Sequence, residues 1–169
     1  MKLFVRRIWS IKDVMFIYNG IRYGIKEKVF TEKDLWGKLK LIIDSNIRFY
    51  IFGVETGTDG LVVEVGFGAI KDKKQVYKIF VYPQFRGNGY GIRISSWIMK
   101  HILKGGYIPV CWVKDSNCWW MSMKEQGMEC VENSKWTTVS KYMLLNLKQY
   151  LKMIDKYEID KIVLVKRQV

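Results

Sequence analysis

The chain has 169 residues, which is the length of one domain and enough to bury a core without metal or disulfide support. A hydrophobic fraction of 49% and a charged fraction of 27% are ordinary for a globular protein, and no apolar run reaches the length of a membrane span. The formal net charge of +13 is unusual. It favours an anionic partner, such as a nucleic acid, an acidic protein surface or the phosphates of a coenzyme.

The few potential metal ligands are poorly spaced. The three cysteines, Cys111, Cys118 and Cys130, include no C-x-x-C pair, and the single histidine, His101, falls on an apolar helical stripe. This spacing argues against a zinc or iron site, so we expect no metal. An odd number of cysteines suits a reducing compartment, and no signal peptide is recognisable. We therefore expect a cytoplasmic protein without a membrane segment, either a monomer or a homodimer.

The first elements are predicted from hydrophobic periodicity and capping signals. A strand is expected from Lys2 to Ile8, and Ser10 can cap a short helix that ends at Asn19-Gly20. A second helix is expected after a capping pair formed by Thr31 and Asp34.

A meander of strands is predicted next, because turn-rich pieces separate three apolar runs. The runs span Arg48 to Glu55, Leu61 to Lys71 and Gln75 to Tyr82, and we expect them to pair in antiparallel fashion. A helix from Gly91 to Leu103 then leads to a strand from Tyr107 to Val113. Because a helix separates this strand from the preceding one, the two should pair in parallel.

The remaining chain predicts one more helix and two strands. The helix runs from Asn117 to Gly127, and the strands from Met128 to Val131 and from Trp136 to Leu145. We expect residues 1–146 to form the main domain. Residues 147–169 look like a helix and a short strand, which form either an extension packed on the same core or a dimer contact.

The most informative segment is IFVYPQFRGNGYGI, residues 79–92. An apolar strand meets Pro83 and continues into a loop that contains Arg86, Gly87, Gly89 and Gly91, followed by an amphipathic helix. Glycines allow positive φ and close approach of the backbone to an anion, and the helix N-terminus adds its dipole. The segment therefore predicts a pyrophosphate-binding loop.

Two common nucleotide loops do not fit this segment. A P-loop needs a Lys-Ser or Lys-Thr pair after its last glycine, and a dinucleotide fingerprint needs G-x-G-x-x-G. The pattern V-x-P followed by Q-x-x-G-x-G instead resembles the acyl-CoA loop of the GNAT superfamily of N-acyltransferases. The residues that carry the resemblance are Val81, Pro83, Gln84, Arg86, Gly87, Gly89 and Gly91.

The resemblance implies a fold of the α/β class with a mixed sheet (α+β mixed). In that fold a central, mostly antiparallel sheet carries helices on both faces, and two parallel strands splay apart to admit coenzyme A. The predicted order of elements over residues 1–146 agrees with it, and the final helix and strand would be a C-terminal extension.

The resemblance also implies that acetyl-CoA is the coenzyme. Backbone groups near Phe80 and Val81 would pair with the pantetheine amides, and N–H groups from Arg86 to Gly91 would hold the pyrophosphate. The implied coenzyme-binding set is Phe80, Val81, Gln84, Arg86, Gly87, Asn88, Gly89, Tyr90, Gly91 and Asn117.

The chain departs from the family where a tyrosine commonly protonates the departing thiolate. Asn117 lies one residue closer to Gly127 than the family spacing requires, and alignment on Gly127 places Met123 at the tyrosine position. A thioether cannot donate a proton. Either Tyr90 or Ser122 supplies the acid, or the thiolate leaves without one.

The transfer of an acyl group to an amine also needs a group that accepts the proton of the amine. Glu64 shares a strand face with Gly66 and Gly68, and we choose it as the base, followed by Glu55 and then Asp115. In the alternative interpretation, Glu64 forms a cross-strand ion pair with Lys78.

The acceptor is less well defined. Residues 71–124 contain ten Lys or Arg and two acids, and Trp112, Trp119 and Trp120 lie near Lys114 and Lys124. Aromatic faces among lysines can stack nucleobases, although they can equally be core. We expect an N-acetyltransferase that acts on a primary amine of unknown identity, in a DNA base, an aminoacyl-tRNA or a protein. The alternative is a non-catalytic basic module that binds nucleic acid or a protein partner.

Overall fold

The structure is a computed structural model that describes residues 2–30, 35–56, 61–114, 117, 119–133 and 139–165. The strands are β1 (Leu3–Arg7), β2 (Ile47–Thr56), β3 (Leu61–Lys71), β4 (Gln75–Val81), β5 (Val110–Lys114), β6 (Met128–Asn133), β7 (Val139–Leu144) and β8 (Val163–Leu164). The α-helices are α1 (Ile11–Lys26), α2 (Leu35–Ile43), α3 (Tyr90–Lys104), α4 (Trp119–Glu125) and α5 (Leu147–Lys156). Two short 3₁₀ turns are η1 (Pro83–Phe85) and η2 (Ile159–Lys161).

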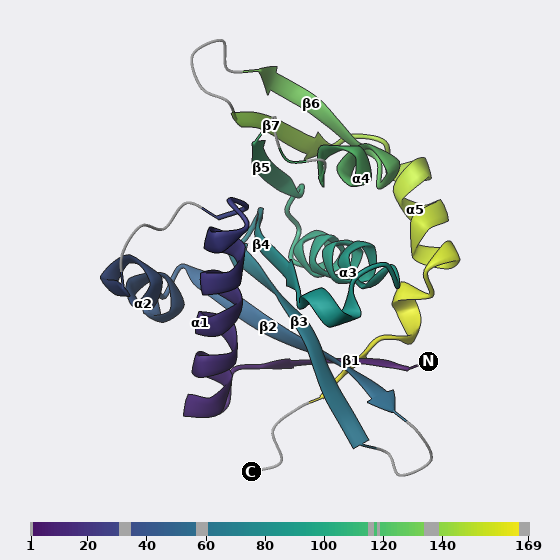
Figure 1. The fold of residues 1–169 in the computed structure, drawn as a ribbon. Helices are drawn as coiled ribbons and strands as arrows, with labels where there is room; N and C mark the ends of the chain where they lie inside the picture. Colours follow the sequence, from purple (N-terminus) through teal and green to yellow (C-terminus); the bar gives the residue numbers. More distant parts are fainter. Residues whose placement is uncertain are drawn as a thin grey trace.

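The described strands form one continuous sheet in the order β6-β7-β5-β4-β3-β2-β1-β8 (Figure 1). Adjacent strands are antiparallel except for two parallel pairs, β4 with β5 and β1 with β8. This arrangement confirms the predicted mixed, mostly antiparallel sheet and the predicted parallel pairing across α3.

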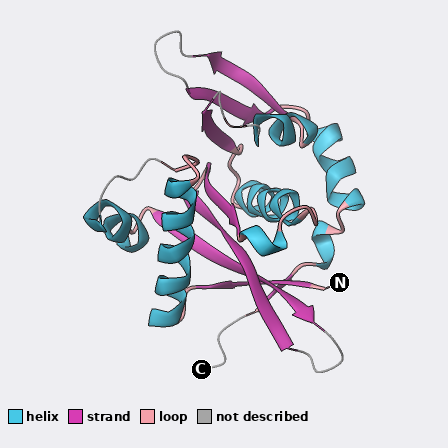
Figure 2. Ribbon diagram, in the orientation of Figure 1, coloured by secondary structure: helices cyan, strands magenta, loops and turns pink. Residues whose placement is uncertain are grey.

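Helices cover both faces of the sheet, as Figure 2 shows. On one face, Ile17 and Ile21 of α1 pack with Phe67 and Phe80 of the central strands. On the other face, α3 and α5 contribute to a larger cluster of buried side chains. The two clusters hold the central strands in place, and β4 therefore has packed side chains on both faces.

Helix α1 is longer than the sequence predicts. Ser10 forms the predicted cap, within a capping box with Asp13, but the helix continues through Gly20 to Lys26. A Cβ atom at Gly20 would lie 2.4 Å from the Phe67 ring. The prediction that this glycine ends the helix was wrong, because its function is to let the helix approach the sheet closely.

Other boundaries differ by a few residues. The strand expected from Tyr107 begins at Val110, and the helix expected from Asn117 begins at Trp119. The strand expected to end at Val131 continues to Asn133. The capping pair before α2 and the first residues of the strand expected from residue 136 lie outside the described residues.

The segment that follows β7 contacts both α3 and the far edge of the sheet. The buried Tyr150 of α5 donates a hydrogen bond from its hydroxyl to the carbonyl of Ser96, at 2.8 Å. Strand β8 then pairs in parallel with β1, with Val163 opposite Phe4. Among the described helices, none combines the length and the apolar character needed to cross a membrane.

Candidate functional site

Strands β4 and β5 part soon after they meet. Their pairing is confined to Gln75 with Val110 and Val76 with Cys111. Within the described strands, no residue of β4 beyond Val76 is paired with β5. A cavity of about 600 Å³ lies between the diverging strands.

Three parts of the chain line this cavity. They are strand β4 with the glycine loop, strand β5 with the turn that follows it, and the end of α1 with the residues just after it. The cavity brings together these predicted coenzyme-binding residues: Phe80, Val81, Arg86, Gly87, Gly89, Tyr90, Gly91 and Asn117. Gln84 and Asn88 are not among its lining residues.

The loop has the backbone conformation that its glycines predict. Gly87 has φ of 82° and Gly89 has φ of 72°, and Gly89 occupies the N-cap of α3. A Cβ atom at Gly87 would meet nothing within 4 Å. The N–H groups of Gly87, Asn88 and Gly89 find no backbone acceptor within the described part of the chain. The loop therefore presents backbone donors and the positive end of a helix dipole beside the cavity.

Other polar groups of the loop serve to hold its shape. The Asn88 amide donates to the carbonyls of Phe85 and Arg86, each at 3.2 Å. The N–H of Arg86 donates to the Pro83 carbonyl, also at 3.2 Å. The side chain of Asn88 thus closes the turn, and its N–H group is what remains for a ligand.

The Arg86 side chain fastens the loop to its surroundings. Its Nε donates to the Val81 carbonyl at 3.0 Å, and its two terminal nitrogens donate to Glu27 at 2.9 and 2.7 Å. Two parallel bonds between a guanidinium and a carboxylate fix geometry well. The sequence had suggested Arg86 as a coenzyme ligand, and in the structure its guanidinium links β4, the loop and the end of α1.

Gly91 is required for packing. A Cβ atom there would lie 2.9 Å from the Trp119 ring, which covers the start of α3. The Asn117 side chain lines the cavity and accepts the N–H of Trp119 at 3.1 Å, at the beginning of α4.

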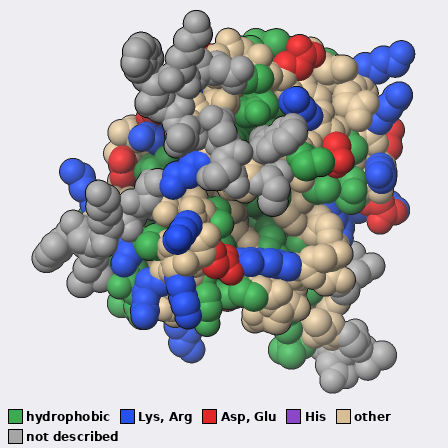
Figure 3. All heavy atoms as spheres, turned by 45° about the horizontal axis from the view of Figure 1, so that its top comes forward, with side chains coloured by type: hydrophobic (Ala, Val, Ile, Leu, Met, Phe, Trp, Pro, Cys, Tyr) green, Lys and Arg blue, Asp and Glu red, His purple; other side chains and the backbone are tan. Residues whose placement is uncertain are grey.

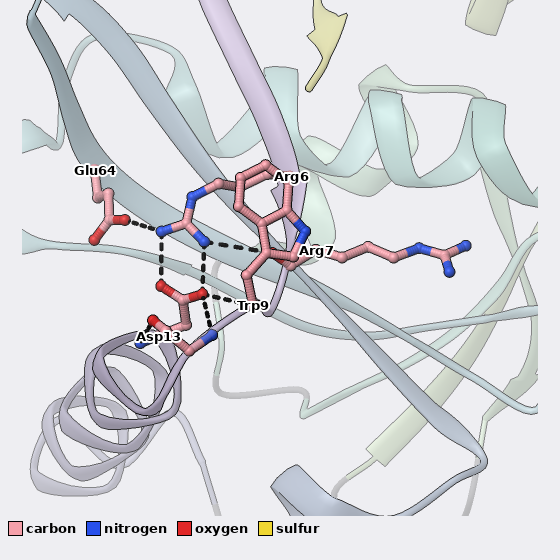
Figure 4. A network of polar contacts seen from close by, with 6 residues as sticks. Arg6, Arg7, Trp9, Asp13 and Glu64 are labelled. Atoms are coloured by element: carbon pink, nitrogen blue, oxygen red, sulfur yellow. Dashed lines mark hydrogen bonds and ion pairs between the residues drawn. The ribbon is translucent and has the colours of Figure 1, made fainter. Parts of the chain in front are cut away.

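Glu64, the residue chosen as base, lies outside the cavity. Its carboxylate accepts a hydrogen bond from Arg6 of β1, which also makes two bonds of 2.7 and 2.8 Å to Asp13 (Figure 4). Strand register places Lys78 opposite Ala69. The alternative pairing of Glu64 with Lys78 is therefore wrong, and Arg6 is the cation that binds Glu64.

Asp13 is the centre of this network. Burial on its own raises the pKa of this carboxyl, but the hydrogen bond from Arg6 and the N–H groups of Trp9 and Ser10 outweigh burial and lower the pKa to about 2. The Asp13 side chain is 6% exposed. The network thus fixes the start of α1 against β1 and β3.

Glu64 opens onto a second depression of about 650 Å³, which it shares with Gln84 and Tyr82. The Tyr82 hydroxyl donates to the Phe16 carbonyl at 2.6 Å. Burial, with a smaller contribution from the charge of Glu64, raises the pKa of Tyr82 to about 12. Tyr82 therefore stays protonated at neutral pH.

The other predicted catalytic residues are dispersed. Tyr90 is 4% exposed and lines the cavity, whereas Ser122 and Glu55 do not line it. Met123 of α4 is fully buried in the core. Asp115 lies outside the described residues. Within the described ranges, no group of three His, Cys, Asp or Glu side chains is placed to hold a metal ion.

Sequence reasoning missed the wall that the end of α1 contributes. Glu27, Val29 and Phe30 all line the cavity, together with residues of β4 and β5. Lys28, with φ of 60°, lies in the turn after α1. The sequence would have revealed this wall if α1 had been predicted at its full length, because the longer helix brings Glu27 to the loop.

The fold is similar to that of several solved structures, two of which are N-acetyltransferases. The spermidine/spermine N-acetyltransferase SpeG from Vibrio cholerae matches with a TM-score of 0.61 and 14% identity, covering 89% of this chain and 97% of that chain. The PaiA N-acetyltransferase from Thermoplasma acidophilum, in complex with coenzyme A, matches with a TM-score of 0.58 and 15% identity, covering 85% and 99%. A domain from Methanocaldococcus jannaschii matches with a TM-score of 0.69 and 14% identity, covering 84% and 97%.

These matches establish the GNAT fold for the chain. The resemblance that the glycine loop suggested is thus confirmed for the fold, including the helices on both faces of the sheet. The sequence matches no protein-family model and no curated protein.

Proposed function

We propose that this protein is an acyl-CoA-dependent N-acyltransferase that moves an acetyl group from acetyl-CoA to a primary amine. The observation that carries this proposal is the parting of β4 from β5 after Val76, directly before a loop with open, positive-φ glycines. The two features together form an extended slot that ends at a set of backbone donors. This shape and polarity suit a chain of amides with a pyrophosphate at one end.

The residues of the slot fit coenzyme A in this way. Backbone groups near Phe80 and Val81, beyond the point where β4 pairs with β5, can hydrogen-bond the pantetheine amides as an added strand would. N–H groups of Gly87, Asn88 and Gly89 can hold the pyrophosphate. Acetyl-CoA supplies the acyl group as a thioester. The glycine loop would therefore hold the pyrophosphate, and β4 would hold the pantetheine chain.

Acetyl transfer needs a proton donor for the thiolate and a proton acceptor for the amine. Tyr90 lies in the cavity wall, and we keep it as the candidate donor to the departing thiolate. Glu64 remains our candidate base, acting through water. It lines the second depression together with Tyr82 and Gln84, which lie at the start of the glycine loop. Ser122 is the weaker acid candidate, since it does not line the cavity.

Acetyl transfer can be tested directly. The protein is incubated with acetyl-CoA and, separately, with a polyamine, a lysine peptide and amine-bearing nucleotides. Release of free thiol is followed together with the mass of each acceptor. The proposal predicts thiol release that depends on an acceptor and a mass increase of one acetyl group. Acetyl-CoA that neither binds nor turns over would contradict it.

A non-catalytic basic module with the same fold is the competing function, and Gly89→Glu separates the two. The variant places a carboxylate beside the loop donors, while a Cβ atom there approaches only the Tyr157 ring, at 3.5 Å. For an enzyme, the substitution abolishes turnover. For a module whose basic surface is its function, it leaves nucleic-acid binding intact, and the wild-type protein releases no thiol with any acceptor.

A further inference from the structure

One wall of the cavity carries an indole that is open to solvent. Trp112 of β5 is 45% exposed and lines the cavity. Its neighbours Cys111 and Val113 are buried in the cluster on the α3 side of the sheet. Because side chains alternate along a strand, Trp112 and Lys114 face the opposite side, toward α1. An aromatic face and an ammonium group therefore share this wall.

The part of the lining that comes from β4 and from the residues after α1 carries the same pair of chemical groups. Phe30 lines the cavity, and the Nζ atom of Lys78 lies 4.5 Å from the centre of its ring. Lys141 likewise lies over the Trp112 ring at 5.3 Å, and its Nζ atom is 3.7 Å from Glu132 of β6. Aromatic rings beside lysine ammonium groups thus occur at two places in or next to the lining of the cavity.

The charge of the lining selects between acceptors. Among the described lining residues, three are cationic, Lys78, Arg86 and Lys114, and one is acidic, Glu27, which binds Arg86. Because Arg86 engages Glu27, no acidic side chain of the described lining is left to bind the ammonium group of a polyamine or a lysine. An ammonium group that is desolvated without a carboxylate partner is bound poorly. The lining therefore favours an acceptor whose amine is carried on an anionic group.

We propose that the acceptor is an amine carried on a nucleotide, whose base stacks on Trp112 and whose phosphate lies near Lys114. This inference rests on the proposed function, since it assigns the second substrate of the same cavity. Stacking of a base on an exposed aromatic ring combines with phosphate contacts in many nucleic-acid sites. In Figure 3, Lys and Arg side chains are spread over the face shown, around a hollow with hydrophobic side chains. A basic face suits a polynucleotide, and a single nucleotide satisfies the same chemistry.

The test measures acceptor binding apart from the coenzyme. Protein saturated with CoA is titrated with AMP, with a short single-stranded DNA, with RNA of the same sequence and with spermidine. We expect at least one nucleotide probe to bind about tenfold more tightly than spermidine, with affinity that falls as salt is raised. AMP binding equal to that of the oligonucleotides identifies a free nucleotide as the acceptor class, and tighter oligonucleotide binding identifies a polynucleotide.

Three variants locate the contact. Measured in protein saturated with CoA, Trp112→Ala should weaken binding of the nucleotide probe about tenfold, the loss expected for one stacked base. Lys114→Glu should weaken it by a similar factor. Lys12→Glu is the matched control, because it changes the net charge equally at an exposed position of α1 that does not line the cavity.

The outcomes separate the two proposals. Spermidine binding as tightly as every nucleotide probe, or nucleotide binding unaffected by Trp112→Ala, overturns the acceptor assignment while CoA binding still stands. If CoA itself fails to bind in a direct titration, the proposed function falls. Nucleotide binding that survives without CoA, and that depends on Trp112, would then describe a binding module.

Discussion

The glycines of β3 and the glycines of the loop after β4 are required for different reasons. A Cβ atom at Gly66 would lie 2.2 Å from the carbonyl oxygen of Phe80, so that residue is fixed by the close approach of two strands. At Gly87 a Cβ atom would meet nothing, and only the positive φ restricts the residue. The first region uses glycine to build the sheet. The second uses it to expose backbone donors beside a cavity.

The same contrast holds for the charged residues of the two regions. At the start of α1, Arg6 binds both Asp13 and Glu64. At the loop, Arg86 binds Glu27, and the backbone N–H groups from Gly87 to Gly89 have no backbone acceptor among the described residues. Side-chain charges thus stabilise the fold in both places, and the loop backbone is what remains for a ligand.

The largest effect should come from Gly66→Ala. Because the added methyl group meets a backbone oxygen, β3 and β4 must move apart, and we expect the free energy of unfolding to fall by about 3 kcal/mol. Urea denaturation followed by circular dichroism measures it. An alanine at this position with wild-type stability would show that the strands do not approach as described.

The second effect in size should come from acid, which weakens the network at Asp13. Its pKa of about 2 lies below the usual 3.8, so its contribution is complete above about pH 4 and is lost as pH falls through 2. The shift corresponds to about 2 kcal/mol between pH 5 and pH 2. We expect Asp13→Asn to be less stable than wild type at pH 5, by roughly 3 kcal/mol, since Arg6 loses its partner. The gap between the two proteins should narrow toward pH 2, and a constant gap would mean that Asp13 titrates normally.

The smallest effects should come from Gly87→Ala and Gly106→Ala. Gly106, at the C-terminal end of α3, has φ of 80° and equally open surroundings. A non-glycine residue in this conformation costs about 1 kcal/mol. Both variants should therefore lose the same modest stability in thermal unfolding. A much larger loss at Gly87 would mean that the loop glycine has a packing role that its open surroundings do not show.

The order of elements and the anion loop could be predicted from local patterns. Alternating apolar runs gave the strands, and proline with three glycines before an amphipathic helix gave the loop. The end of α1 could not be predicted, because a glycine at position 20 is a typical helix terminator. Its actual role, close packing against Phe67, depends on the tertiary fold.

Side-chain partners were the other missing part. Glu27 is 59 positions from Arg86, and Arg6 is 58 positions from Glu64. No local pattern joins such pairs, since only the folded sheet brings them together. For this reason the sequence suggested Lys78 as the partner of Glu64, where the structure has Arg6, and it did not reveal that Glu27 is the partner of the Arg86 side chain.

The most direct measurement is a pair of calorimetric titrations with acetyl-CoA, on Gly87→Glu and Gly106→Glu. The two variants share the same substitution, the same backbone strain and the same change of charge, at opposite ends of α3. We predict that Gly106→Glu binds acetyl-CoA with wild-type affinity and that Gly87→Glu loses at least about a hundredfold, or about 2.7 kcal/mol. Equal affinities for the two variants would contradict a coenzyme site at the loop.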